Sequence, residues 1–453
     1  MTLSFGTDGV RGDARRELTP EFVEALGRTA AEVLGADRLA VGRDPRASGP
    51  SLVEALCRGV RRAGGNPVDL GVVPTPVVAR WCDDEQVAGA MVSASHNRWH
   101  DNGVKLFGPG GRKLSDEAQI DIERRLSGAA AGVGAAAGAG ADAEVAADAA
   151  GVSDAGELAS RRHLEAVTAS LEGRDLDGLH VVVDAANGAG SVSGPECLRG
   201  LGAEVDTIHA SPDGYNINDD CGSMHPESLQ AAVVSSGADA GVAFDGDADR
   251  VLAVDGGGTL VDGDQILAIC AIDRAARRRL IGDAVVVTVM ANLGLRRAMA
   301  ARGIGVVETP VGDRHVLGAL EDRGLMLGGE QSGHLIFRDL ATTGDGLLTA
   351  VQLLDTLKRS GASLRSLAAR TMTRVPQVLV GVPMPSSARS ADLDTALGAI
   401  AAAAAARLGD SGRVLVRRSG TEPLIRVMVE ATDPGTAQAE ADRLSARVAE
   451  ALS

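Results

Sequence analysis

Residues 180–208, HVVVDAANGAGSVSGPECLRGLGAEVDTI, contain the pattern that decides the fold. A β-branched strand leads into a glycine-containing loop, then a helix, then a glycine before a second strand. Two strands joined in this way by a helix form a βαβ unit. The same order of segments recurs in residues 39–70 and 284–308. Three copies predict an α/β protein with three similar domains rather than one large sheet, although any α/β enzyme can contain segments that look alike.

A smaller fourth domain is expected after residue 371. Three prolines there precede an alanine-rich helix, a strand, a basic loop, a second strand and a final helix. The helices are predicted at 391–408 and 434–451, and the strands at 413–417 and 424–430. This order is typical of a small α+β domain. The predicted domains are therefore 1–156, 157–252, 253–370 and 371–453.

One segment within the first predicted domain has an unusual composition. Residues 128–151 are almost entirely alanine and glycine with a few acids. The glycines should interrupt any helix, and the segment offers few side chains to bury. We expect a flexible surface segment there, without chemistry.

Composition also restricts where the protein works. A net charge of −16 argues against a general nucleic-acid surface, and no run approaches the ~18 continuous apolar residues of a membrane span. The N-terminal residues lack the basic and apolar regions of a signal peptide. The five cysteines are never spaced as Cys-x-x-Cys, which indicates reduced thiols rather than a disulfide or zinc scaffold. We expect a cytoplasmic protein with neither nucleic-acid nor membrane partners.

An acidic loop, FDGDADR, occupies residues 244–250 directly after an apolar run. Its small spacers allow three carboxylates to face one point, and these belong to Asp245, Asp247 and Asp249. Three anions so close together repel, and a hard divalent cation relieves the repulsion. An EF-hand loop would need glycine and glutamate where this chain has Arg250 and Gly256. The loop therefore favours Mg²⁺ completed by a phosphate oxygen; the alternative is a solvated acidic turn.

The source of that phosphate is not a bound nucleotide. The sequence contains no Gly-Lys dipeptide, no Gly-x-Ser-x-Gly, no His-Glu-x-x-His and no clean Gly-x-Gly-x-x-Gly, so the corresponding enzyme classes are excluded. Residues 91–107, MVSASHNRWHDNGVKLF, offer serine hydroxyls at the end of an apolar stretch. A serine in such a loop can carry a phosphoryl group, although a plain Ser/Asn turn has the same pattern.

Basic residues are distributed unevenly. Arginine outnumbers lysine by 42 to three, and the lysines are Lys105, Lys113 and Lys358. Because lysine can shift its pKa and carry a proton while arginine effectively cannot, each lysine is a candidate acid or base. Residues 413–426 form a basic island, with four arginines against one glutamate, that could bind an anionic ligand.

Four motifs, in order along nearly the whole chain, resemble those of the α-D-phosphohexomutase superfamily. They are the phosphoserine loop (residues 93–97 with 101–105), the metal loop (245–250), the sugar-binding loop GEQSGH (329–334) and the phosphate-binding loop RRSGTEP (417–423). The resemblance implies three similar α/β domains with mixed sheets and a smaller C-terminal domain around a central cleft. Residues 5–12, 329–334 and 418–430 are most similar to the branch of the superfamily that acts on glucosamine phosphates.

The resemblance implies a reversible conversion of glucosamine 6-phosphate to glucosamine 1-phosphate. A phosphoserine enzyme, a 1,6-bisphosphate intermediate and one Mg²⁺ per chain would be involved, and the product would feed UDP-N-acetylglucosamine and cell-wall synthesis. The expected partner is a small phosphosugar, and the protein would be a monomer or homodimer. The alternatives are a phosphomannomutase or phosphoglucomutase of the same superfamily, a Mg²⁺-dependent phosphatase, or a metal-binding protein without activity.

Carried over residue by residue, the resemblance makes Ser95 the phosphorylated serine and a metal ligand together with the three aspartates. Arg11, Lys105 and His96 would lie beside it, with Lys105 as general acid or base, and Arg250 would neutralise phosphate charge. The residues expected to bind the substrate are Glu330, Ser332, His334, Arg417, Ser419, Gly420, Thr421 and Arg426.

Some assignments stay open. The family's usual proline after Ser-His-Asn is Arg98 here, so the loop should be less rigid and more basic. His96 and His334 either transfer protons or only form hydrogen bonds. Asp313 and Arg314 either line the sugar site or form a domain-interface ion pair. Tyr215 and Asn218 are interpreted as loop structure.

Overall fold

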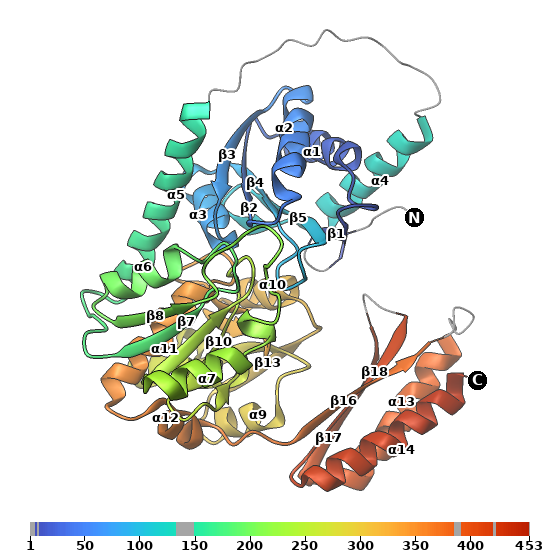
Figure 1. Cartoon of the computed structure of the whole chain (residues 1–453). Helices are drawn as coiled ribbons and strands as arrows, with labels where there is room; N and C mark the ends of the chain where they lie inside the picture. Colours follow the sequence, from blue (N-terminus) through green and yellow to red (C-terminus); the bar gives the residue numbers. More distant parts are fainter. Residues whose placement is uncertain (1–4, 7–8, 133–148, 385–390, 420–422, 453) are drawn as a thin grey trace. The chain divides into compact units, whose positions relative to one another are not determined.

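The computed structural model describes residues 5–6, 9–132, 149–384, 391–419 and 423–452 (Figure 1). The chain forms two compact units. The larger unit comprises residues 1–289 and 305–369, and the smaller comprises residues 290–304 and 370–453.

The first sheet of the larger unit is mixed, with the order β1-β5-β4-β2-β3 and β6 beside β5. Its strands are β1 (Val10–Asp13), β2 (Arg38–Arg43), β3 (Asn66–Val72), β4 (Ala88–Val92), β5 (Asp101–Gly108) and β6 (Arg112–Lys113). The helices around it are α1 (Pro20–Leu34), α2 (Gly49–Arg62), α3 (Thr75–Glu85), α4 (Asp116–Gly132) and α5 (Ala149–Ala169).

Alternation along the strands places helices on both faces of this sheet. In β2, Leu39 and Val41 belong to the core under α1, α2 and α4, whereas Ala40 belongs to the core under α3 and α5. This follows from the two-residue period of a strand, in which successive side chains point to opposite faces. A central strand buried on both sides is typical of α/β domains.

The second and third sheets have the orders β11-β10-β9-β7-β8 and β13-β12-β14-β15. The second comprises β7 (His180–Asp184), β8 (Glu204–Ile208), β9 (Ala240–Phe244), β10 (Val251–Asp255) and β11 (Leu260–Val261), with α6 (Ser193–Gly200) and α7 (Glu227–Ser236). The third comprises β12 (Ala284–Thr288), β13 (Gly305–Thr309), β14 (Leu327–Gly329) and β15 (Leu335–Phe337), with α8 (Gly263–Ala276), α10 (Asp313–Arg323), α11 (Gly346–Ser360) and α12 (Leu364–Thr371).

All three sheets share one topology. A first strand lies between two parallel partners, and a fourth strand then adds antiparallel to the third. In the first sheet these strands are β2, β3, β4 and β5; in the second, β7, β8, β9 and β10; in the third, β12, β13, β14 and β15. The predicted threefold repeat of α/β units is confirmed.

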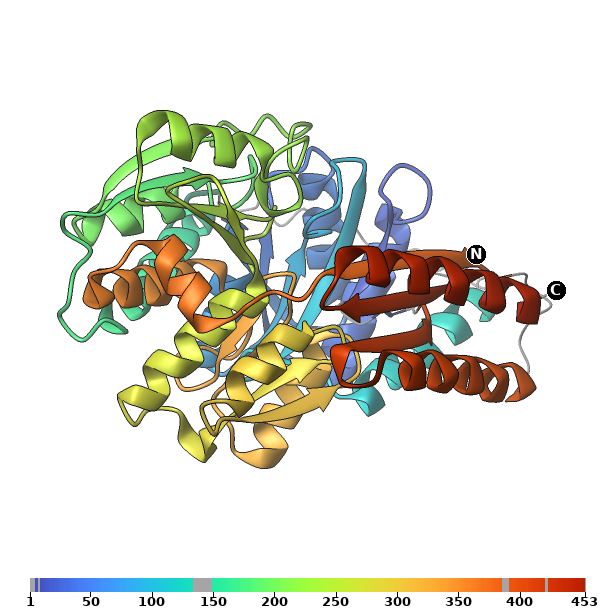
Figure 2. The same ribbon diagram turned by 90° about the horizontal axis from the view of Figure 1, so that it is seen from below.

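The smaller unit contains an antiparallel sheet of order β16-β18-β17. Helices α13 and α14 pack side by side against it (Figure 1, Figure 2). Its elements are α9 (Leu293–Ala300), β16 (Gln377–Pro383), α13 (Ala391–Leu408), β17 (Gly412–Arg418), β18 (Leu424–Ala431) and α14 (Pro434–Leu452). The helices and strands predicted after residue 371 are confirmed.

One prediction about the alanine- and glycine-rich segment is wrong in part. Helix α4 continues to Gly132 and α5 begins at Ala149, so residues 128–132 and 149–151 are helical. Alanine is the strongest helix former and extends a helix that has already been nucleated. The rest of the segment, 133–148, lies outside the described residues. In the described part of the chain, none of the helices combines the length and apolar character needed to cross a bilayer.

Candidate active site and metal centre

The candidate nucleophile, Ser95, follows β4 and is fully buried. Its hydroxyl donates to Asp245 Oδ2 at 2.5 Å, across 150 residues of sequence. Its backbone N–H donates to Ser93 Oγ at 2.8 Å, and its φ of +53° is left-handed. A non-glycine residue in this region is strained and is held there by its surroundings. The phosphoserine loop and the metal loop are therefore in direct contact.

The metal loop approaches Ser95 closely because of Gly246. A Cβ atom at this position would lie 2.6 Å from the carbonyl oxygen of Ser95 and 2.7 Å from Asn218 Nδ2. The second spacer, Ala248, adopts a left-handed φ of +55°. The predicted need for small spacers between the three aspartates thus has two physical causes, close approach and backbone conformation.

The three aspartates converge as a group that could hold a cation. Their carboxylate oxygens lie within 4.8 Å of one another, and all three residues are buried. Asp247 Oδ1 and Asp249 Oδ1 are buried without a hydrogen-bond partner in the described part of the chain. Buried carboxylate oxygens normally accept hydrogen bonds or bind a cation. Hard oxygen donors of this kind fit Mg²⁺.

The surroundings shift the pKa values of two of the three aspartates in opposite directions. Burial, reinforced by Asp249 and Asp247, raises the pKa of Asp245 to about 8. Burial also opposes ionisation of Asp249, but Lys105, His334 and Arg250 together outweigh it and hold the pKa of that carboxyl well below its usual range. Neighbouring negative charges disfavour the ionised form of a carboxyl group, and a nearby cation favours it.

Lys105, on β5, supplies part of that positive charge. Its ammonium donates to Asp247 Oδ2 and Asp249 Oδ2, each at 2.7 Å, and the side chain is only 2% exposed. The other two lysines also pair with acids. Lys113 binds Asp313, and Lys358 binds Asp175. Each lysine therefore joins two different predicted domains of the larger unit.

The sugar-binding loop of the third sheet reaches the same centre through His334. Its Nδ1 lies 3.7 Å from Asp249 Oδ1 and its Nε2 lies 3.7 Å from Asp313 Oδ2. Although burial opposes protonation, Asp249 and Asp313 raise the pKa of His334. Glu330 accepts a hydrogen bond from the Gly312 N–H at 3.2 Å, and Ser332 is exposed.

Asp313 and Arg314 each form an ion pair between the first and third predicted domains. Asp313 binds Lys113, and Arg314 Nη1 lies 3.0 Å from Asp116 Oδ1. Both residues therefore form domain-interface ion pairs.

Three further residues surround Ser95. Arg11, on β1, donates to the Ala94 carbonyl at 3.4 Å, and Arg250 Nε lies 3.7 Å from Asp249 Oδ1. His96 Nδ1 lies 3.3 Å from Ser95 Oγ. Burial, together with Arg250 and Arg11, lowers the pKa of His96 to about 3. The His96 ring is therefore neutral at neutral pH.

The smaller unit presents a pair of arginines. Arg417 on β17 stands directly opposite Arg426 on β18. Burial and the neighbouring Arg426 lower the pKa of Arg417, and its buried Nε has no hydrogen-bond partner among the described residues. Like charges on facing strands repel, so an anion would relieve the pair. Ser419 donates its N–H to Leu424 O at 2.8 Å, and the predicted residues Gly420 and Thr421 lie outside the described residues.

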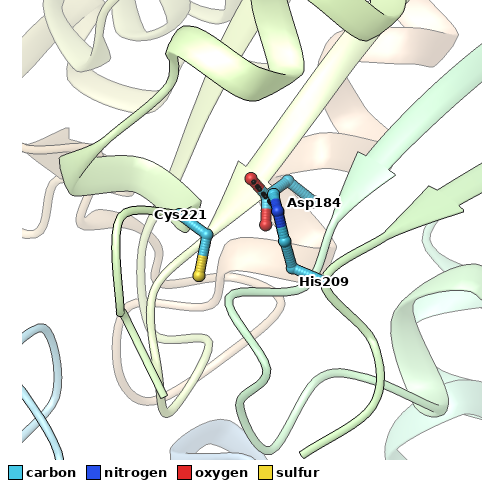
Figure 3. A group of neighbouring side chains, drawn as sticks. All are labelled: Asp184, His209 and Cys221. Carbon is cyan, nitrogen blue, oxygen red and sulfur yellow. Dashed lines mark ion pairs between the residues drawn. The ribbon is translucent and has the colours of Figure 1, made fainter. Parts of the chain in front are cut away.

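A second group with metal-ligating side chains lies at the carboxyl ends of β7 and β8 and contains Asp184, His209 and Cys221 (Figure 3). The Asp184 carboxylate already accepts N–H groups from Ala186 and Gly222, both at 2.9 Å, and lies 3.1 Å from His209 Nδ1. Burial, with Asp184 nearby, raises the pKa of the Cys221 thiol to about 12. The group therefore fixes the turn that follows Cys221.

The sequence and structure of this chain were compared with those of known proteins. Four family profiles match the chain in order: Phosphoglucomutase/phosphomannomutase alpha/beta/alpha domain I at residues 2–131, domain II at 161–258, domain III at 262–375 and the C-terminal domain at 379–450. The phosphoglucosamine mutase of Thermobifida fusca (strain YX) is 50% identical over 461 residues, covering 100% of this chain and 99% of the relative. The chain belongs to the phosphoglucosamine mutase family.

Solved structures show the same fold as this member of the phosphoglucosamine mutase family. A phosphoglucomutase/phosphomannomutase family protein from Burkholderia thailandensis has a TM-score of 0.79 at 25% identity, covering 98% of this chain and 97% of its own. The N-acetylphosphoglucosamine mutase of Aspergillus fumigatus, solved with GlcNAc-6P and magnesium, has a TM-score of 0.68 at 20% identity, covering 100% and 96%. At 20% identity, the similarity to the Aspergillus fumigatus structure shows a shared fold and nothing more.

In this member of the phosphoglucosamine mutase family, Arg98 replaces the usual proline after Ser-His-Asn, and its side chain forms new ion pairs. Arg98 forms ion pairs with Asp220 at 3.0 Å and Asp219 at 3.5 Å. The extra positive charge expected from this residue is therefore offset. These pairs are exposed, so each contributes about 0–1 kcal/mol.

Three residues outside the predicted set of site residues hold the site: Thr75, Arg46 and Asn218, of which only Asn218 was noted from the sequence, as loop structure. Thr75 Oγ1 donates to Asp247 Oδ2 at 2.6 Å, and the Thr75 N–H donates to the Asp247 carbonyl at 2.9 Å. Arg46 is fully buried and donates to the carbonyls of Ser95 and Asn97. Asn218 donates to the same two carbonyls. No local sequence pattern marks such contacts, because their partners are distant in sequence.

Proposed function

We propose that the protein interconverts glucosamine 6-phosphate and glucosamine 1-phosphate through a phosphorylated Ser95. The observation that carries this proposal is the contact between the Ser95 hydroxyl and Asp245, 2.5 Å apart inside the acidic triad. A buried serine against a cation-binding group is suited to carry a phosphoryl group. The relatives named phosphoglucosamine mutase, which match over the full chain, support the choice of substrate.

The reaction is a balanced exchange of one phosphoryl group. The bond between phosphorus and Ser95 Oγ breaks as a bond to the free sugar O1 or O6 forms, giving glucosamine 1,6-bisphosphate. The sugar hydroxyl loses its proton, and Ser95 Oγ gains one. The bisphosphate turns around, and its other phosphate returns to Ser95. Such a transfer depends on positioning and charge neutralisation.

The cations around Ser95 supply most of that neutralisation. Arg11 and Arg250 face the phosphoryl position, and Lys105 is the candidate group for giving or taking the proton. Neutral His96 is suited to hydrogen bonding at Ser95 Oγ. When bound by Asp245, Asp247, Asp249 and the Ser95 phosphate, one Mg²⁺ adds stabilisation of negative charge.

The substrate is held by two further sets of residues. Glu330, Ser332 and His334 bind the sugar hydroxyls. The cross-strand arginines Arg417 and Arg426, with Ser419, Gly420 and Thr421, bind the phosphate that is not reacting. Because guanidinium groups bind phosphate through paired N–H donors, the strained arginine pair is suited to this role.

The proposed reaction also indicates the partner and the cellular compartment of the enzyme. The partner is a small phosphosugar. The free, buried cysteines suit a reducing cytoplasm. The boundaries 1–156, 157–252, 253–370 and 371–453, and a monomeric or homodimeric state, stay predictions.

Replacement of Ser95 by alanine tests the proposal directly. Ser95→Ala should remove the phosphate from the intact mass and lower mutase activity by at least about a thousandfold, because no acceptor remains. The matched control is Ser115→Ala, which changes an exposed serine of the same predicted domain and should keep both. Full activity in Ser95→Ala would overturn the mechanism in favour of a phosphatase or another route.

Substrate choice needs a separate measurement. Wild-type enzyme is given glucosamine, glucose and mannose 6-phosphates, and kcat/KM is compared. Glucosamine 6-phosphate should be the best substrate. A higher kcat/KM for mannose or glucose 6-phosphate would replace the proposed substrate while leaving the phosphoserine chemistry intact.

A further inference from the structure

The strained backbone of Ser95 is held by two donors on its carbonyl oxygen. Arg46 Nη2 lies 3.1 Å from this oxygen and Asn218 Nδ2 lies 2.8 Å from it. The left-handed φ of +53° costs a serine conformational energy that glycine would not pay. The two hydrogen bonds therefore fix the peptide group that directly follows the Cα atom of Ser95.

The same two donors also bind the carbonyl oxygen of Asn97, two residues further along the loop. Asn97 O accepts from Arg46 Nη2 at 2.8 Å and from Asn218 Nδ2 at 2.9 Å. Arg46 belongs to the first predicted domain, like the loop itself. Asn218 belongs to the second, 123 residues away from Ser95. Its amide therefore ties the phosphoserine loop to the domain that carries the metal loop.

The backbone around Asn218 is itself firmly held. Its N–H donates to Ala186 O at 3.0 Å, and the Gly222 N–H donates to Asp184 Oδ2 at 2.9 Å. Asp184, which accepts this hydrogen bond, lies close to His209 and Cys221 (Figure 3). Asn218 has a left-handed φ of +55°, which asparagine tolerates better than most residues. Gly246 leaves the room that its amide needs, since a Cβ there would lie 2.7 Å from Nδ2.

We propose that Asn218 is a positioning residue for phosphoryl transfer: its amide holds Ser95 in the left-handed conformation that directs Oγ at Asp245. This inference rests on the proposed mutase function. Asn218 acts through the peptide groups of Ser95 and Asn97, so its loss should slow the chemical step and leave substrate binding nearly unchanged. In kinetic terms kcat falls while KM stays.

Two substitutions remove the amide in different ways. Asn218→Gly keeps the left-handed backbone without steric cost, and Asn218→Asp keeps the shape but replaces the N–H₂ donor by an oxygen. Each should lower kcat by at least about tenfold and change KM by less than about twofold. The matched control is Asn216→Ala. Asn216 binds Ser211 O and the Asp213 N–H in the same turn, so its loss should reduce kcat less than either Asn218 variant.

A thermal-unfolding cycle provides a readout that does not depend on activity. In the wild type, loss of Asn218 lets Ser95 leave its strained conformation and recover part of the lost free energy, whereas Ser95→Gly has no such strain to release. Asn218→Gly should therefore lower the melting temperature more in the Ser95→Gly background than in the wild type. Equal losses in both backgrounds would overturn the inference. So would unchanged kcat in both Asn218 variants, a loss no larger than that of Asn216→Ala, or a raised KM with kcat intact. If the wild type itself carries no phosphoserine and shows no mutase activity, the proposed function falls instead, and the unfolding cycle still decides whether Asn218 holds Ser95.

Discussion

At the scale of single residues, the centre depends on a buried ammonium that lies between two carboxylates. Lys105 contacts Asp247 and Asp249 at 2.7 Å each. A guanidinium could match the charge, but it is larger and planar and does not release its proton. Lysine at this position therefore combines a compact charge with the ability to take part in proton transfer.

Replacing Lys105 by arginine should separate these two properties. Lys105→Arg keeps a positive charge, yet kcat should fall at least about a hundredfold, because general acid–base catalysis contributes roughly 10²–10⁴. The same substitution at Lys113, which pairs with Asp313, should keep most activity. Steady-state kinetics on both variants, with unfolding curves to confirm folding, provide the measurement. If Lys105→Arg is more than half as active as wild type, Lys105 serves only as a charge.

At the scale of loops and strands, the metal loop packs so closely against the phosphoserine loop at Gly246 that a side chain there would overlap with Ser95. Gly246→Ala would place a Cβ 2.6 Å from the Ser95 carbonyl oxygen, so one of the two loops must shift. We expect a loss of stability of about 1–3 kcal/mol, as for other overpacked sites, and a larger loss of kcat than of substrate affinity. Denaturant unfolding and kinetics measure both.

A second glycine-to-alanine change provides the control. Gly318 lies in α10, and a Cβ there would meet no atom within 4 Å. Gly318→Ala should leave kcat unchanged and stabilise the protein by up to about 1 kcal/mol, because alanine is the better helix former. Similar behaviour of the two variants would mean that the contact at Gly246 is unimportant.

In the smaller unit, a buried glutamate makes strand β18 sensitive to pH. Glu430 accepts from the Leu293 N–H at 3.2 Å and lies 3.5 Å from Arg413 Nη1. Burial raises the pKa of Glu430, and Arg413 only partly offsets it. The folded unit therefore binds this proton more tightly than the unfolded chain does. Its free energy of unfolding should fall as pH rises from about 4.3, the ordinary glutamate value, through the raised pKa.

Removing the Glu430 carboxyl group should remove this decrease in the free energy of unfolding with rising pH. Glu430→Gln keeps an acceptor for Leu293 but cannot ionise, so its melting temperature should vary less between about pH 5 and pH 8 than that of the wild type. Calorimetry over this range gives the comparison. An unchanged slope in Glu430→Gln would contradict the assignment.

At the scale of the whole molecule, the cation should add to stability because only the folded chain brings the three aspartates together. At a free Mg²⁺ concentration about 100 times its Kd, the stabilisation should be about 2.7 kcal/mol, and EDTA should abolish both this gain and the activity. Asp247→Asn should lose most of the Mg²⁺-dependent rise in melting temperature. Asp206→Asn, a change at an exposed aspartate of the same predicted domain, should keep it; equal rises in both would place the cation elsewhere.

Much of the architecture could be predicted from sequence because it depends on local patterns. The three βαβ units, the helix at 391–408 and the two strands before the final helix follow from hydrophobic period and glycine placement. The convergence of Ser95 and Asp245, 150 residues apart, was accessible only through resemblance of motifs. The roles of Thr75, Arg46 and Asn218 were not accessible, since their partners are backbone carbonyls or carboxylates from distant segments.

The three lysines give the larger unit an intrinsic chemical reporter. Lys105 and Lys113 have side chains that are 2% and 13% exposed, and Lys358 is 34% exposed. Because each ammonium is paired with a carboxylate of another predicted domain, an amine-acylating reagent should label Lys105 only after the domains separate, and Lys113 and Lys358 more readily. The 42 arginines do not react with such reagents. Apart from the α-amino group, the order in which the three lysines become labelled would therefore follow the opening of the interfaces between the predicted domains of the larger unit, without any introduced probe.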